Sequence, residues 1–372
     1  MALYRVSAWR SRMPRIIIAF VLFAGAIASA QETDSTRIRE AGVSEYRSGH
    51  YAQAEGLLRR ALAMAIKGND QYGVALGYSA LGDLYQATVR FREAEESYRK
   101  SISILTGQPE YAHALAIMWR NLAAALTTKD YSGAFAAIKE ASKLVKAYRV
   151  QDPVLNAEIL NTLGILYFQQ GKIDKAKSCF LQASEIKFLP ADGPESPMTE
   201  ILNNLGRVYH RAGQYSKAED AYKRSLRFAE ARFGLSHVTV TVTLNNLAWL
   251  YSETGRYAEA EQYSQRSFAI LERRESAFEE RQFVEALYTL AKTYLRQNRH
   301  SEAARLLSRA AEIARRNPGQ TMPAAQIALV LETYSKVLKD LHNPVEAERL
   351  EAEVRRIRAS AAFTVGARVS EK

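Results

Sequence analysis

The feature that most constrains this 372-residue chain is a segment of eight residues that occurs twice. Residues 202–209 read LNNLGRVY, and residues 244–251, which begin 42 positions later, read LNNLAWLY. Weaker copies repeat the small residue of this segment at steps of 41 to 44 positions, at Gly82, Ala123, Gly164, Gly206, Ala248, Ala291 and Ser335. A fixed period indicates an array of small units, each packed on its neighbours, and not a domain built around one core.

A second segment follows each copy of the first. It begins with an aromatic residue and continues x-x-Ala-Glu, as in residues 91–95, 215–219 and 257–261. Its alanine recurs eight times, at Ala54, Ala94, Ala134, Ala176, Ala218, Ala260, Ala303 and Ala347. The chain is therefore expected to contain eight units.

Both segments have the spacing of amphipathic helices. Leu202, Leu205 and Tyr209 stand at i, i+3 and i+7, which is one face of a helix with 3.6 residues per turn. Gly206 lies where a bulky residue would hold the next helix away. Between the two helices, glycines such as Gly213, or Asn298 in a later unit, supply the left-handed residue that ends the first helix. Each unit is predicted to be a helical hairpin.

This pattern of a small residue, a tyrosine, a glycine and an aromatic-x-x-Ala-Glu segment resembles the tetratricopeptide repeat (TPR) over residues 33–358. The LNNLAWLY segment and the steps of 40 to 44 residues look most like the kinesin light chain subtype, since the usual TPR period is 34. The resemblance implies an all-α fold, a right-handed α-solenoid of about eight TPR helical hairpins. Longer connections are expected at residues 188–198 and 317–323.

The first thirty residues differ from the rest. Four arginines precede an almost entirely apolar run over residues 16–27, and Ala28-Ser29-Ala30 ends it with small residues. This is the pattern of a secretory signal peptide cleaved after Ala30, and the run is short for a membrane span. We expect a signal peptide at 1–30, a TPR solenoid at 31–358 and a largely disordered tail at 359–372. Met13 is an alternative start, and an uncleaved N-terminal anchor is the alternative reading of the leader.

Charge and cysteine content narrow the function further. The formal net charge is +11, and it falls to about +7 when the four leader arginines are removed. Such a mild bias over the remaining chain predicts no nucleic-acid partner. The single cysteine, Cys179, cannot form an internal disulfide, and we expect it in the core.

No catalytic or cofactor motif is present in the sequence. The six histidines have no metal-binding spacing, and there is no phosphate loop, nucleophile elbow or cysteine pair. We therefore expect no enzymatic activity, no metal and no cofactor.

The resemblance places partner contacts on the first helix of each unit, which lines the concave groove of the solenoid. Carried over residue by residue, it implies a groove formed by Arg120, Asn121, Asn161, Asn203, Asn204, Arg207, His210, Arg211, Asn245, Asn246, Trp249, Tyr288, Lys292 and Arg296. An asparagine amide can both donate to and accept from a peptide backbone. The alternative is that these asparagines hydrogen-bond between adjacent helices. The basic residues also suit the C-terminal ends of their helices.

The sequence thus predicts a non-catalytic scaffold that is exported to the periplasm or the extracellular space and binds a peptide or partner protein in its groove. No membrane span is expected after cleavage of the leader. Two alternatives remain open: an intracellular or membrane-anchored regulatory or sensor TPR module, and an enzyme or a non-catalytic subunit of an enzyme complex.

Overall fold

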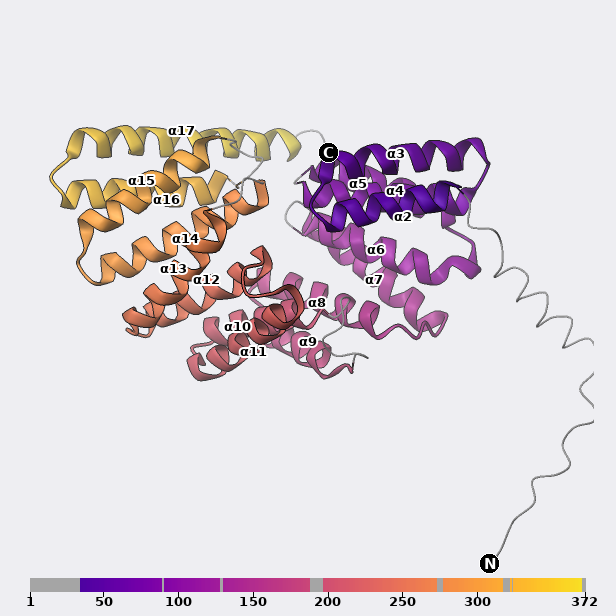
Figure 1. Cartoon of the computed structure of the whole chain (residues 1–372), viewed down its shortest axis with the longest axis horizontal. Helices are drawn as coiled ribbons and strands as arrows, with labels where there is room; N and C mark the ends of the chain where they lie inside the picture. Colours follow the sequence, from indigo (N-terminus) through magenta and orange to yellow (C-terminus); the bar gives the residue numbers. More distant parts are fainter. Residues whose placement is uncertain are drawn as a thin grey trace, which may run out of the picture. The chain divides into compact units, whose positions relative to one another are not determined.

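A computed structural model describes residues 34–369, except 89, 128–129, 188–196, 273–276, 317–321 and 323. The described residues form sixteen α-helices and one short 3-10 helix, without a strand (Figure 1). The chain divides into two compact units, residues 1–81 and residues 82–372. The all-α prediction is confirmed.

The first unit contains the hairpin of α2 (Asp34–Arg47) and α3 (Tyr51–Lys67), and most of α4 (Gln71–Ala87). The two helices of the hairpin pack closely, since a Cβ atom added to Gly42 would lie 2.9 Å from the Leu58 side chain. Only glycine fits at this crossing unless the leucine moves.

The second unit continues from the end of α4 with α5 and six further hairpins. Their helices are α5 (Phe91–Leu105), η1 (Pro109–Tyr111), α6 (Ala112–Leu126), α7 (Tyr131–Ala147), α8 (Pro153–Gln169), α9 (Ile173–Glu185), α10 (Met198–Arg211), α11 (Tyr215–Phe233), α12 (Val238–Glu253), α13 (Tyr257–Leu271), α14 (Ala277–Arg296), α15 (His300–Arg316), α16 (Ala324–Asp340) and α17 (Pro344–Val369). Even-numbered helices are the first helices of their repeats, and odd-numbered helices are the second helices. With α2–α3 and α4–α5 they form the eight predicted repeats.

The small residue of the first helix is required by an aromatic ring of the second. A Cβ atom added to Gly206 would lie 2.5 Å from the fully buried Tyr222 ring. Gly164 has the same relation to Phe180, at 2.5 Å. A Cβ atom this close to a ring would force one of them to move, so these glycines allow the ring to fill the space between the helices. The predicted close packing at Gly206 is confirmed.

The turns between first and second helices follow the prediction as well. Gly213 and Gly255 adopt φ angles of 70° and 78°, and Asn298 takes the equivalent place with φ 59°. Because a left-handed residue ends the first helix in each case, the hairpin turn is determined locally.

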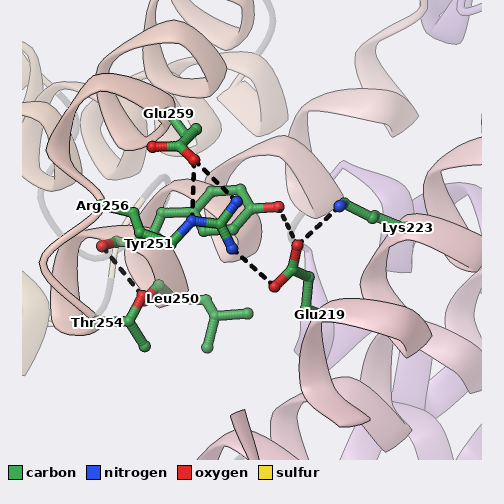
Figure 2. Close-up of polar contacts among 7 residues, drawn as sticks. All are labelled: Glu219, Lys223, Leu250, Tyr251, Thr254, Arg256 and Glu259. Carbon is green, nitrogen blue, oxygen red and sulfur yellow. Dashed lines mark hydrogen bonds and ion pairs between the residues drawn. The ribbon is translucent and has the colours of Figure 1, made fainter. Parts of the chain in front are cut away.

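Polar contacts join the second helix of one repeat to the following hairpin, as Figure 2 shows around Glu219. The Tyr251 hydroxyl donates to Glu219 Oε1 at 2.9 Å, and Arg256 Nη1 donates to Glu219 Oε2 at 2.9 Å. The Arg256 guanidinium also lies 4.2 Å from the centre of the Tyr251 ring and pairs with Glu259. We call Glu219, Tyr251, Arg256 and Glu259 the inter-repeat staple.

The same staple recurs one repeat later. The Tyr294 hydroxyl donates to Glu261 at 2.9 Å, and Arg299 Nη1 donates to Glu261 at 3.1 Å. Arg299 stacks 3.8 Å from the Tyr294 ring centre and also pairs with Glu302. The carboxylate of one second helix thus fixes the position of the following hairpin.

The structure differs from the sequence-based expectations at Cys179 and at the C-terminal tail. Cys179 is half-buried and not in the core, because its neighbour Phe180 takes the buried position on α9. The backbone of α17 stays helical to Val369. A disordered tail was expected from residue 359, but the alanines of this segment favour a helix.

The expected leader and most of both long connections lie outside the described residues. No helix in the described part is long and apolar enough to cross a membrane.

Candidate functional site

All fourteen residues expected in the groove lie on first helices, from α6 to α14. Consecutive first helices contact one another: α6 touches α8, α8 touches α10, α10 touches α12, and α12 touches α14. Their side chains therefore meet across repeats, and the first-helix face, meaning the side formed by α6, α8, α10, α12 and α14, is continuous between neighbours.

The asparagines form a ladder of hydrogen bonds between repeats. Asn204 Nδ2 donates to Asn161 Oδ1 at 3.0 Å, and Asn246 Nδ2 donates to Asn203 Oδ1 at 2.9 Å. Asn161 and Asn203 are buried, with exposed fractions of 6% and 8%. The four side chains form two pairs, which link α8 to α10 and α10 to α12. This is the alternative that the sequence left open, in which the asparagines hydrogen-bond between adjacent helices.

The other two asparagines are also engaged with neighbouring helices. Asn121 Nδ2 donates to Asp83 Oδ1 at 2.9 Å, and Asn245 Nδ2 lies 3.5 Å from the Gln282 carbonyl oxygen. Both side chains are buried, and the Oδ1 atom of each has no hydrogen-bond partner among the described residues. Their contact with a partner protein stays a prediction.

Arg120 occupies an acidic part of the first-helix face. Its guanidinium lies 2.5 Å from Glu158 on α8. Burial, reinforced by the nearby Glu200 charge, raises the pKa of the Glu158 carboxyl against the opposing effect of Arg120. Arg120 is therefore already paired within this region.

The C-terminal ends of α10, α12 and α14 carry a different arrangement, centred on Trp249. The indole is 45% exposed, and its Nε1 donates to Glu253 at 3.1 Å. His210 packs beside it with ring centres 4.5 Å apart, and His210 Nε2 lies 2.6 Å from Glu253. Arg296 lies 3.9 Å from the same carboxylate and donates to Ser252 at 2.8 Å. The tryptophan is thus exposed but held in place.

Cations flank Trp249 on both sides. On α10, the guanidiniums of Arg207 and Arg211 lie 5.1 and 5.5 Å from the Phe168 ring centre. On α14, the Lys292 ammonium lies 6.0 Å from the Tyr288 ring centre. Within the described part of the chain, these three cations have no carboxylate within ion-pair distance. We call this surface the basic–aromatic face: Arg207, Arg211, Trp249, Lys292 and Arg296.

Tyr288 borders this face. It is half-buried against the core of the last repeats, and its hydroxyl lies 3.3 Å from Thr333 Oγ1 on α16. Like the asparagines, it connects one first helix to the next.

Two residues of the site were missed from the sequence. Glu253 binds Trp249 and His210, and Phe168 supports two arginines. Both stand at repeat positions already selected in other units, since Glu253 corresponds to Arg211 and Phe168 to His210. Reading every unit at the same positions would have identified them. In the described chain, no group of three His, Cys, Asp or Glu side chains is placed to bind a metal.

Three family models described as tetratricopeptide repeat match the sequence. The first matches residues 34–107 and 197–273, the second 161–232, and the third 284–317. Together the matches cover more than half of the chain, and they agree with the repeats seen in the structure. No curated protein matches the sequence.

Several solved structures share the fold. The apo form of the quorum sensor NprR from B. thuringiensis is 14% identical, with a TM-score of 0.66 over 92% of this chain and 93% of that one. A STAND protein with a TPR sensor from Pyrococcus horikoshii is 15% identical, with a TM-score of 0.61 over 91% of this chain and 50% of that one. Apo RapI is 17% identical, with a TM-score of 0.56, over 76% and 98% of the two chains. Identities this low show the fold alone, and the kinesin light chain subtype stays a prediction.

Proposed function

Because the chain belongs to the tetratricopeptide-repeat family, we propose that it is a non-catalytic scaffold that binds a segment of a partner protein through the first-helix face. The family is generally non-catalytic, and its members generally bind proteins or peptides. The observation that carries the proposal is Trp249, a large apolar ring that is exposed yet fixed by Glu253 and His210. A rigid exposed aromatic loses little entropy when a ligand covers it, which is typical of binding hot spots.

The charges around Trp249 favour an acidic segment. Arg207, Arg211 and Lys292 have no carboxylate partner in the described chain, whereas Arg120 is already paired with Glu158. An acidic ligand would add ion pairs at Arg207, Arg211 and Lys292 without breaking any existing ion pair. Binding of this kind weakens with added salt because exposed charges are screened.

The site of action is proposed from the leader. An arginine-rich start, the apolar run 16–27 and Ala28-Ser29-Ala30 support export and a mature chain that begins at Gln31. Cell fractionation with mass spectrometry of the N-terminus tests this. Full-length chain in the cytosol would instead favour a regulatory or sensor module, since NprR is a quorum sensor and the TPR part of the STAND protein is a sensor.

The binding proposal is tested by photo-crosslinking in the native cell. A benzophenone amino acid in place of Trp249 should capture a partner through an acidic segment, which mass spectrometry of the linked peptide identifies. The same probe at Arg227, exposed on the second helix α11, is the matched control. Reversing the charges of Arg207, Arg211 and Lys292 to glutamate should abolish capture. An unchanged crosslinked peptide after charge reversal would refute the proposal.

A further inference from the structure

An open cleft of about 700 Å³ lies between the third and fourth repeats, on residues outside the basic–aromatic face. It is bounded by the end of α7, the start of α8 and the residue that follows α9. Its apolar lining consists of Val145, Pro153, Ile159, Leu160, Leu163 and Ile186. Its size falls within the range of small-molecule sites, about 300 to 1,000 Å³.

The cleft has a local cause in the length of α9. This helix ends at Glu185 and has 13 residues, whereas α11, the second helix of the following repeat, has 19. Measured from the shared alanine, α11 continues six residues further than α9, from Ala218 to Phe233 compared with Ala176 to Glu185. We relate the cleft to this shorter helix, because Ile186, the residue after its end, lines the cleft together with the half-buried Leu160 and Leu163.

Polar groups gather at one side of the cleft. Lys146, Gln151 and Asn156 contribute an ammonium and two carboxamides. No ion pair involves Lys146 among the described residues, and its side chain is exposed. A cation beside an apolar cleft, without a carboxylate of its own, fits a ligand that brings the negative charge with it.

Asp152 is the one acid that lines the cleft, and its oxygens are directed elsewhere. Oδ1 accepts from the Leu155 backbone N–H at 2.9 Å, and Oδ2 lies 2.8 Å from His113 Nε2. Although burial would raise it, these contacts and the His113 charge lower the pKa of the Asp152 carboxyl. The carboxylate thus caps α8 and pairs with α6, and it does not neutralise Lys146.

We propose that this cleft binds a single alkyl chain with a carboxylate head, its chain against the apolar lining and its head at Lys146. Chain burial provides the binding energy, since each CH₂ group removed from water adds to the affinity. One ammonium with two amide donors matches a monoanion. The acid group decides orientation and selectivity.

Isothermal titration calorimetry of the full protein with dodecanoate tests the proposal. Saturable one-to-one binding is expected, and dodecan-1-ol should bind at least roughly tenfold more weakly because it brings no charge to Lys146. Absence of saturable binding, or equal affinity for the alcohol, would overturn it.

Two variants locate the ligand. Lys146→Glu should weaken dodecanoate binding by roughly tenfold or more, while Lys143→Glu should change it less than about twofold. Lys143 is the matched control because it lies on the same helix, pairs with Glu140 and does not line the cleft. Leu163→Trp should fill the cleft and abolish binding, with circular dichroism confirming that the helices remain. Equal affinity of the Lys146 and Lys143 variants would overturn the assignment, while crosslinking from position 249 reports on the separate scaffold role.

Discussion

The fifth and sixth repeats share a segment inside their first helices but differ in three ways. Both contain Leu-Asn-Asn-Leu, and in both the second asparagine donates to an asparagine of the preceding repeat. Inside the hairpin, however, Gly206 faces Tyr222, while the corresponding residues of the sixth repeat are Ala248 and Ser264. A larger residue on one helix is matched by a smaller residue on the other.

The other two differences lie outside the core. The sixth repeat holds the staple through Arg256, whereas the fifth has Gln214 at that position. On the first-helix face, Arg207 is replaced by Trp249 and Arg211 by Glu253. The shared residues join repeats, and the variable exposed residues give each repeat its own surface. We therefore expect stability to depend on the buried pairs and the bonds between repeats, and partner choice to depend on the variable exposed residues.

The largest effect is expected at the size match between the two helices. In Gly206→Ala the new methyl group would lie 2.5 Å from the buried Tyr222 ring, and we expect a loss of about 2 to 3 kcal/mol, with Gly206→Leu at least as damaging. The reverse change, Ala248→Gly, should cost only about 1 kcal/mol through helix propensity. Urea denaturation measures both.

The double variant Gly206→Ala with Tyr222→Ser reproduces the pair of the sixth repeat. Its cost should be less than the sum of the two single costs, because the methyl group occupies space that the ring has left. Strictly additive costs would show that the two positions do not compensate for each other.

The next largest effect concerns the asparagine ladder. Asn204→Ala and Asn246→Ala together should lower stability by about 2 kcal/mol, since each removes one bond of about 1 kcal/mol and leaves a buried acceptor unpaired. Arg207→Ala, on the same face, should leave the melting temperature unchanged and weaken partner binding. A stable double asparagine variant with weakened binding would restore the groove role expected from the sequence.

The features that could be predicted from the sequence are the local ones. Period, helix faces and the left-handed turn at Gly213 could all be predicted because they depend on residues close together in the chain. The partner of Asn204 could not, because Asn161 is 43 positions away and the choice between ligand and neighbour depends on how the helices meet. Glu253 stands at a repeat position that the resemblance selects in other units, but its role depends on contacts with His210 and Arg296 in other repeats, which the sequence does not show.

A smaller effect separates two buried tyrosines. The Tyr251 hydroxyl donates to Glu219, so Tyr251→Phe should cost about 1 kcal/mol. The Tyr222 hydroxyl is buried and has no hydrogen-bond partner in the described part of the chain, and Tyr222→Phe should leave stability unchanged or raise it. Thermal melts of the two variants test this difference. Equal losses would mean that the staple contributes nothing beyond ring packing.

The smallest effect is the dependence of the staple on pH. Burial would raise the pKa of the Glu219 carboxyl, but hydrogen bonds from Lys223 and Tyr251 and the charge of Arg256 outweigh it and lower the pKa. A carboxyl with a lowered folded-state pKa adds stability above its unfolded pKa, about 4.3, and loses it as pH falls through the folded value. Glu219→Gln should therefore reduce stability at pH 7, and its difference from the wild type should shrink below about pH 4. Glu348→Gln is the control, because Glu348 is exposed on α17 and no ion pair involves it in the described chain. It should track the wild type throughout, and a Glu219→Gln deficit that persisted at low pH would show that packing, and not charge, makes the staple stabilising.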